Sequence, residues 1–210
     1  MADTKERILL TALRLFARDG YEAVSVSDIA GALGITKGAL YRHYRNKRDI
    51  FNSILSRMER RDAEKAVENS VPAGTVAEMA DAYRAASIDS IIAFSKAMFR
   101  YWTQDEFASQ FRRMLTVEQF RSAEMARLYQ QYLVSGPISY VADLLGSLGF
   151  PQPERKAVAL YAPMFLLYSV YDGGENRDEA LQRMDECLEN VRKSLMEDEG
   201  QCREGMEKHE

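Results

Sequence analysis

The sequence of 210 residues is poor in the residue types on which most disulfide, metal and hydrolytic proteins depend. It has two cysteines, Cys187 and Cys202, which are too few and too isolated for a disulfide scaffold or a zinc site. It has two histidines, His43 and His209, and neither has a serine or cysteine partner suggestive of nucleophilic catalysis. No run approaches the roughly 18 apolar residues of a membrane span. These absences predict a cytoplasmic protein that is not an enzyme, needs no cofactor or metal and has no membrane partner.

The hydrophobic content of 46% and the charged content of 29% are typical of a soluble globular protein. Apolar residues recur with the period of a helix almost throughout, and no alternating strand pattern is found. The sequence therefore predicts an all-α fold of about nine or ten helices. The expected helices are 5–18, 26–33, 37–43, 47–68, 76–102, 105–115, 117–134, 137–148, 154–171 and 178–197.

The positions of proline and glycine residues predict two domains and a C-terminal tail. Pro72 and Gly74 mark the clearest break, at residues 69–74. We expect a DNA-binding domain of three helices at 1–50, connected through the helix 47–68 to a regulatory and dimerisation domain at 51–197. The polar segment 198–210, which contains Gly200 and Gly205, is expected to be disordered.

The net charge of −4 at first argues against a nucleic-acid partner, but the charge is unevenly distributed. Residues 1–60 hold 11 Lys/Arg and 7 Asp/Glu, which gives +4. Residues 61–210 hold 17 and 25, which gives −8. A basic head on an acidic body is the distribution expected of a protein that binds a polyanion through its N-terminal part.

The stretch 25–49 combines the features of a helix-turn-helix DNA reader. Ser25 and Asp28 have the spacing of a capping box, Thr36 is placed to cap the next helix, and Gly34 suits the turn between them. The bend between these two helices is called the elbow below. Six apolar or aromatic residues can pack together inside it: Ile29, Ala30, Leu33, Ile35, Leu40 and Tyr44. Five Lys/Arg and no acid lie between residues 37 and 48. Such charges alone usually mark a solvated helix end, but together with the caps and the elbow they favour DNA binding.

The second helix of this pair has an outward face suited to DNA. With Leu40 at the centre of the buried face, a step of about 100° per residue places four residues outward: Gly38, Tyr41, Arg42 and Arg45. Gly38 permits close approach to DNA, Tyr41 can offer its hydroxyl to a phosphate, and Arg42 can reach a guanine edge. Three further cations can reach phosphates: Arg45, Lys47 and Arg48.

The helix-turn-helix pattern of residue types and spacing comprises Ser25, Ile29, Ala30, Gly34, Ile35, Thr36, Gly38, Leu40, Tyr41, His43, Tyr44, Lys47 and Ile50. In this respect residues 4–55 resemble the N-terminal domain of TetR-family transcriptional regulators. Ser25, Tyr44 and Ile50 stand where Thr, Phe and Leu are usual, so that Tyr44 has an additional hydroxyl. The resemblance implies contacts with the DNA backbone by Ser25, Thr36, Tyr41, His43 and Lys47. It implies that Lys37, Gly38 and Arg42 face the bases.

We call the helix-turn-helix segment at residues 25–49 the reading head. One reading head spans only a few base pairs, and such domains usually work as twofold dimers on palindromes. In the last expected helix, apolar residues recur every three or four positions: Leu181, Met184, Leu188, Val191 and Leu195. The preceding helix adds Tyr161 and Phe165. This pattern predicts a homodimer interface, with the core of a single chain as the alternative. The resemblance implies that the last two helices pair with their mates as a four-helix bundle.

Large, soft side chains gather between residues 88 and 168, and most of them must be core. The resemblance implies a ligand cavity among these helices, and an apolar cavity would suit a small apolar or aromatic effector. The candidate lining residues are Phe94, Met98, Trp102, Phe111, Tyr129, Tyr132, Met164 and Tyr168.

These features predict a ligand-responsive transcriptional regulator. Its simplest form is a repressor that binds a palindromic operator in double-stranded DNA as a homodimer and is released by a small-molecule effector. The alternative is an architectural DNA-binding protein without an effector, which a body with no cavity would favour.

Overall fold

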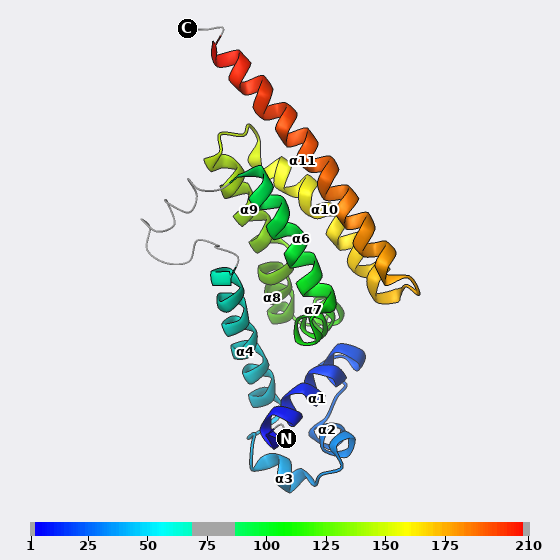
Figure 1. Cartoon of the computed structure of the whole chain (residues 1–210). Helices are drawn as coiled ribbons and strands as arrows, with labels where there is room; N and C mark the ends of the chain where they lie inside the picture. The colour runs from blue at the N-terminus through cyan, green and yellow to red at the C-terminus, as the bar shows by residue number, and fades with distance from the viewer. Residues whose placement is uncertain (1–2, 69–86, 208–210) are drawn as a thin grey trace. The chain divides into compact units, whose positions relative to one another are not determined.

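The computed structural model describes residues 3–68 and 87–207, and every regular element within this part of the chain is a helix. The predicted all-α class is therefore confirmed (Figure 1). The helices are α1 (Thr4–Asp19), α2 (Val26–Leu33), α3 (Lys37–Tyr41), α4 (Lys47–Glu68), α6 (Ile88–Gln104), α7 (Glu106–Glu118), α8 (Ala123–Leu133), α9 (Ser135–Ser147), α10 (Pro153–Gly173) and α11 (Arg177–Glu207).

The first four helices follow the predicted pattern closely because local caps mark most of their ends. α2 and α4 have the expected bounds. α1 begins slightly early, because the carboxylate of Asp3 rather than Thr4 caps it by accepting the Lys5 N–H at 3.4 Å. α3 ends at Tyr41 instead of residue 43, since the His43 N–H donates to the Leu40 carbonyl in a tighter turn.

The expected helix 117–134 is divided by a turn. α7 continues to Glu118, whose carbonyl accepts the N–H groups of both Arg121 and Ser122, and α8 begins only at Ala123. The predicted break at 69–74 and the first part of the expected helix 76–102 lie outside the described residues. α6 covers the rest of that helix from Ile88 onward.

α11 is longer than expected and includes most of the segment predicted to be a disordered tail, of which residues 208–210 lie outside the described residues. It continues to Glu207, where we expected the helix to end at 197. Asp198 forms an ion pair with Lys156 of α10, so the beginning of the expected tail is held against the preceding helix. Gly200 and Gly205 cost about 1 kcal/mol each within a helix, which is too little to end one anchored in this way.

Contacts divide the chain into two compact units that do not follow the expected boundary at residue 50. The first unit comprises residues 1–65 and 104–133, so it holds α7 and α8 as well as the four N-terminal helices. The second unit comprises residues 66–103 and 134–210. The division into a DNA-binding and a regulatory part therefore remains a functional prediction.

The core of the first unit forms where α1 packs against α2 and α7, and α7 packs against α8. Phe16, Phe51 and Phe111 are fully buried there. Tyr21 follows α1 and packs against both Phe16 and Phe51, with ring centroids 5.1 Å apart in each pair. Aromatic packing thus joins the loop after α1 to α4.

The core of the second unit forms where α10 packs against α9 and α11. It contains most of the residues predicted to form the homodimer interface. Tyr161, Met184, Leu188 and Leu195 are buried within one chain, Leu181 and Val191 pack against this core, and Phe165 is half-buried. This burial is what the alternative interpretation, a single-chain core, requires of these residues, and the homodimer interface remains a prediction. Periodicity could not separate the two, because both require the same spacing of three and four residues.

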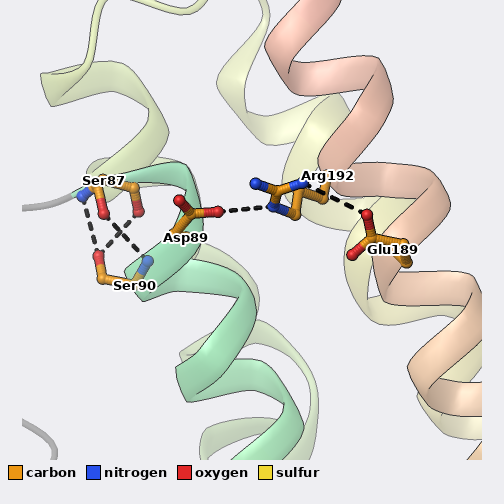
Figure 2. Close-up of polar contacts among 5 residues, drawn as sticks. All are labelled: Ser87, Asp89, Ser90, Glu189 and Arg192. Atoms are coloured by element: carbon orange, nitrogen blue, oxygen red, sulfur yellow. Dashed lines mark hydrogen bonds and ion pairs between the residues drawn. The ribbon is translucent and has the colours of Figure 1, made fainter.

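Polar contacts also hold α6 against α11 in the second unit (Figure 2). Ser87 caps α6: its hydroxyl accepts the Ser90 N–H at 3.1 Å, and the Ser90 hydroxyl accepts the Ser87 N–H at 2.9 Å. In the first turn of α6, Asp89 accepts a hydrogen bond from Nε of Arg192 at 2.6 Å. Arg192 also reaches Glu189 at 3.4 Å. These contacts fix the start of α6 on the surface of α11.

Candidate nucleic-acid interface

The elbow between α2 and α3 is built by two hydroxyl caps and a glycine turn. Ser25 and Asp28 form the predicted capping box, with hydrogen bonds of 3.2 and 2.7 Å, and these bonds lower the pKa of Asp28. Thr36 caps α3 by accepting the Ala39 N–H at 3.1 Å. Gly34 has φ 66° and ψ 28°, the left-handed conformation that glycine adopts without strain. In the Thr36 cap the hydroxyl is an acceptor, so its O–H remains able to donate to a DNA phosphate.

Most of the residues predicted to close the elbow are buried. Ile29, Ala30, Leu40 and Tyr44 are at most 2% exposed, and Leu33 and Ile35 are half-buried. The hydroxyl that distinguishes Tyr44 from the usual phenylalanine donates to the Lys5 carbonyl at 3.2 Å. Burial raises the pKa of Tyr44 to about 12. This tyrosine therefore joins the segment after α3 to the first turn of α1.

The outward face of α3 is exposed, as its predicted role requires. Lys37, Gly38 and Arg42 are exposed, and Tyr41 is 50% exposed although it is a large aromatic side chain. A Cβ at position 38 would meet only the Thr36 hydroxyl, at 3.8 Å, so nothing within the protein requires glycine there. Close approach of DNA remains the predicted reason for Gly38. His43 is half-buried on the flank.

Lys47 has a structural role that the sequence did not reveal. Its ammonium group donates to the Tyr21 carbonyl at 2.7 Å and to the Glu22 carbonyl at 3.3 Å, and it lies 4.3 Å from the centroid of the Tyr21 ring. The side chain thus ties the start of α4 to the loop after α1. Since both acceptors are neutral and an ammonium has three N–H groups, Lys47 keeps its charge and one donor for a phosphate.

Arg48, at the start of α4, is paired with an acid that no sequence pattern indicated. Its guanidinium forms two hydrogen bonds with the carboxylate of Glu124 in α8, one of them 2.7 Å long between Nη1 and Oε2. Nε donates to Asn52 at 3.0 Å, and the group lies 5.1 Å from the centroid of the Phe51 ring. The hydrogen bonds with Arg48 lower the pKa of Glu124.

A fully buried acid, Glu118 at the end of α7, holds the turn between α1 and α2. Its Oε1 accepts the Tyr21 N–H and a hydrogen bond from Arg121 Nη1, each at 3.0 Å. Gly20 lies directly against this carboxylate, because a Cβ there would overlap both Glu118 Oε1 and Arg121 Nη1. Sequence reasoning had no signal for Glu118, which is 97 positions from Tyr21.

The residues proposed for an effector pocket are distributed over both compact units. Phe111, Tyr129 and Tyr132 belong to the first unit, where Phe111 and Tyr132 pack edge to face at 5.2 Å. The others belong to the second unit: Phe94, Met98, Trp102, Met164 and Tyr168. Among these, Tyr168 stacks on Phe99 at 5.2 Å and Phe94 packs against Tyr140. These contacts show aromatic packing, and the pocket itself remains a prediction.

A polar groove of about 640 Å³ lies between the beginning of α1 and α4. Charges of both signs line it, including Asp3, Lys5, Glu6, Arg57 and Arg60. None of the residues proposed for the effector pocket lies there, and its mixed charges do not suit an apolar ligand.

Residues 3–68 and 87–207 contain no group of three His, Cys, Asp or Glu placed to hold a metal ion. No helix within these ranges is long and apolar enough to cross a bilayer.

Comparison with known proteins assigns the N-terminal region. The sequence model of a family described as "Bacterial regulatory proteins, tetR family" matches residues 8–54. The chain is 44% identical over 52 residues to the HTH-type transcriptional regulator AcrR of Shigella flexneri, covering 25% of this chain and 24% of that protein. It is 43% identical over 56 residues to the HTH-type transcriptional repressor BepR of Brucella suis biovar 1 (strain 1330), covering 27% of each. These matches span about a quarter of the relatives' length.

Solved structures match over most of the chain. A transcriptional regulator (TerR/AcrR family) from Aquifex aeolicus VF5 is 17% identical, with a TM-score of 0.64 over 90% of this chain and 99% of that one. SmeT, in a complex with triclosan, is 19% identical, with a TM-score of 0.58 over 91% and 90%. At such identities the likeness shows the fold. The N-terminal match thus shows a tetR-family region at residues 8–54, and the fold shared with solved regulators extends over most of the chain.

Proposed function

We propose that this protein is a transcriptional repressor that binds a palindromic operator as a homodimer and is released by a small apolar or aromatic effector. The observation that carries the DNA-binding part is the exposed basic face of α3, supported by two capped helices and a closed elbow. Lys37, Gly38 and Arg42 face the bases, and Ser25, Thr36, Tyr41, His43 and Lys47 bind the phosphates.

An exposed apolar stripe on α10 supports the homodimer. Val158, Leu166 and Val170 are 49%, 68% and 36% exposed, and their spacing of eight and four residues places them on one side of the helix. Met196 of α11 is exposed as well. These side chains replace the buried α11 seam as the surface that meets a second copy, because leaving them in water is unfavourable.

The effector is proposed from the aromatic content of the body and from a structural relative. SmeT, which shares the fold, is known in complex with triclosan, a small aromatic compound. A ligand that binds better to a dimer with differently spaced reading heads would weaken operator binding by its differential affinity. In the state that binds the operator, the two DNA-reading helices of the dimer lie one turn of DNA apart, about 34–36 Å.

Binding to DNA fragments from the region flanking the protein's own gene tests the proposal. Fluorescence anisotropy across a salt series should show tight, sequence-dependent binding that weakens steeply with salt. Arg42→Ala should relax specificity at one base position and cost about 1–3 kcal/mol on the best site. Arg183→Ala removes the same charge from an exposed position in α11 and is the matched control, expected to leave binding unchanged. Equal binding to all fragments by the wild-type protein would contradict the proposal.

A further inference from the structure

The first turn of α4 carries two neighbouring cations that are held in different ways. Lys47 is bound by two neutral carbonyl groups, so its charge remains available to an anion. Arg48 is bound by the carboxylate of Glu124, so its charge is already compensated within the protein. Both residues directly follow, in the sequence, the basic segment that carries Arg42 and Arg45. The interface therefore contains one available cation and one occupied cation at adjacent positions.

The contact between Arg48 and Glu124 has the geometry that a phosphate would adopt. The two terminal nitrogens of the guanidinium face the two carboxylate oxygens, and the Nη1–Oε2 distance is 2.7 Å. A phosphate presents an equivalent pair of oxygens to the same fork of donors. Nε is bound to Asn52, and the guanidinium plane lies near the ring of Phe51, so the group is already oriented. Exchange of one anion for the other requires no new conformation of Arg48.

The ion pair is accessible to solvent and therefore open to exchange. The side chains of Arg48 and Glu124 are 47% and 36% exposed. Ion pairs at such exposure contribute little to stability and are weakened by salt, whereas a DNA phosphate lies in a field of high negative charge density. A glutamate is ionised at neutral pH, and the hydrogen bonds from Arg48 lower the pKa of Glu124 further, so the carboxylate competes throughout the neutral range.

We propose that Glu124 competes with DNA for Arg48, one of the cations already expected to reach a phosphate, and so regulates a phosphate contact of the DNA interface. This inference rests on the proposed function and adds a residue to the same site. Glu124 lies in the first turn of α8, outside the helix-turn-helix, where the positive end of the helix favours a carboxylate. The position of α8 against α4 therefore sets whether the interface makes one phosphate contact more or fewer.

Glu124→Gln tests the competition, because it keeps the shape of the side chain and removes its charge. At about 0.1 M salt we expect the variant to bind operator DNA roughly threefold to tenfold more tightly than the wild type. The slope of log K against log salt should steepen by about 0.9, the value for one additional phosphate contact. Glu124→Ala should give the same result and excludes a residual hydrogen bond from the glutamine. Thermal unfolding of each variant checks that the fold is retained.

Glu106→Gln is the matched control. Glu106 forms an exposed ion pair with Arg14, between α7 and α1 of the same unit, and its loss changes the net charge equally. We expect this variant to leave both the affinity and the salt slope unchanged.

A double-mutant cycle separates release of Arg48 from a general change in charge. Arg48→Ala should weaken binding less than twofold in the wild-type background, where the guanidinium is occupied, and should abolish the whole gain in the Glu124→Gln background. A gain that persists without Arg48, or a Glu124→Gln variant that behaves like Glu106→Gln, would overturn the inference while the proposed function stands. A wild-type protein that binds no operator DNA would remove both.

Discussion

Replacement of Gly20 by alanine tests whether the buried carboxylate of Glu118 fixes the turn between α1 and α2. Gly20 has φ 91° and ψ 152°, a region that residues with a side chain almost never adopt. A methyl group there would also overlap Oε1 of Glu118 and Nη1 of Arg121. Alanine therefore introduces backbone strain and also displaces the acceptor of the Tyr21 N–H.

The two effects can be given magnitudes. Backbone strain of this kind costs about 1–3 kcal/mol. A buried N–H that loses its acceptor costs about 1–3 kcal/mol more, so Gly20→Ala should lower the free energy of unfolding by about 2–6 kcal/mol. In a Glu118→Ala background no carboxylate is displaced, and Arg121, whose side chain is 52% exposed, can move away. There the same change should cost only the strain, so the two positions should be coupled by about 1–3 kcal/mol.

Urea unfolding followed by far-ultraviolet circular dichroism measures these differences, because helices provide all the regular structure of the described residues. Trp102, the single tryptophan of the sequence, belongs to the second unit, so its fluorescence reports that unit separately. Gly34→Ala is the control: φ is 66°, but nothing lies within 4 Å of the added Cβ. It should cost about 1–2 kcal/mol in both backgrounds. An equal cost of Gly20→Ala with and without Glu118 would refute the role of the carboxylate.

Three further predictions concern stability and assembly. Tyr44→Phe removes the hydrogen bond to the Lys5 carbonyl and should lower the free energy of unfolding by about 1 kcal/mol in urea titrations. Burial raises the pKa values of Tyr44 and Tyr132 to about 12, so each tyrosine binds its proton more tightly in the folded state than in the unfolded state. The free energy of unfolding should therefore be constant below about pH 10 and fall as the pH rises toward 12. The fall should be less steep in Tyr44→Phe, which lacks one of the two groups. Leu166→Glu on the exposed stripe of α10 should shift sedimentation from dimer to monomer with unchanged helix content. Leu188→Asp should instead unfold the second unit, because it places a charge in the core. A Leu166→Glu variant that stays dimeric would contradict the proposal that the α10 stripe forms the dimer interface.

The reading head could be predicted because its determinants are local. The capping box of Ser25 and Asp28, the Thr36 cap and the turn at Gly34 each involve residues within a few positions of one another. The burial of Leu40 and Tyr44 also followed from helical spacing alone. The exposure of Tyr41 and Arg42 is the consequence of the same periodicity on the opposite face.

The long-range polar contacts could not be predicted, because nothing in the sequence connects their partners. Arg48 and Glu124 are 76 positions apart, and each looks like an ordinary surface charge in its own helix. Glu118 ends an amphipathic helix with no sign that it is buried. The role of the apolar positions of α11 could not be predicted for a different physical reason: apolar residues at steps of three and four are needed equally by a core within one chain and by an interface between two.

The unit that carries the reading head is discontinuous in sequence, since residues 104–133 complete what residues 1–65 begin. A hybrid regulator that joins residues 1–65 to a foreign body would uncover the side of α1 that packs on α7 and would leave the turn at Gly20 without its carboxylate. The N-terminal helices of this protein therefore cannot be exchanged as an independent module through a fusion point after α4. Operator preference has to be transferred by replacing exposed side chains of α3 in place, or by moving both segments together.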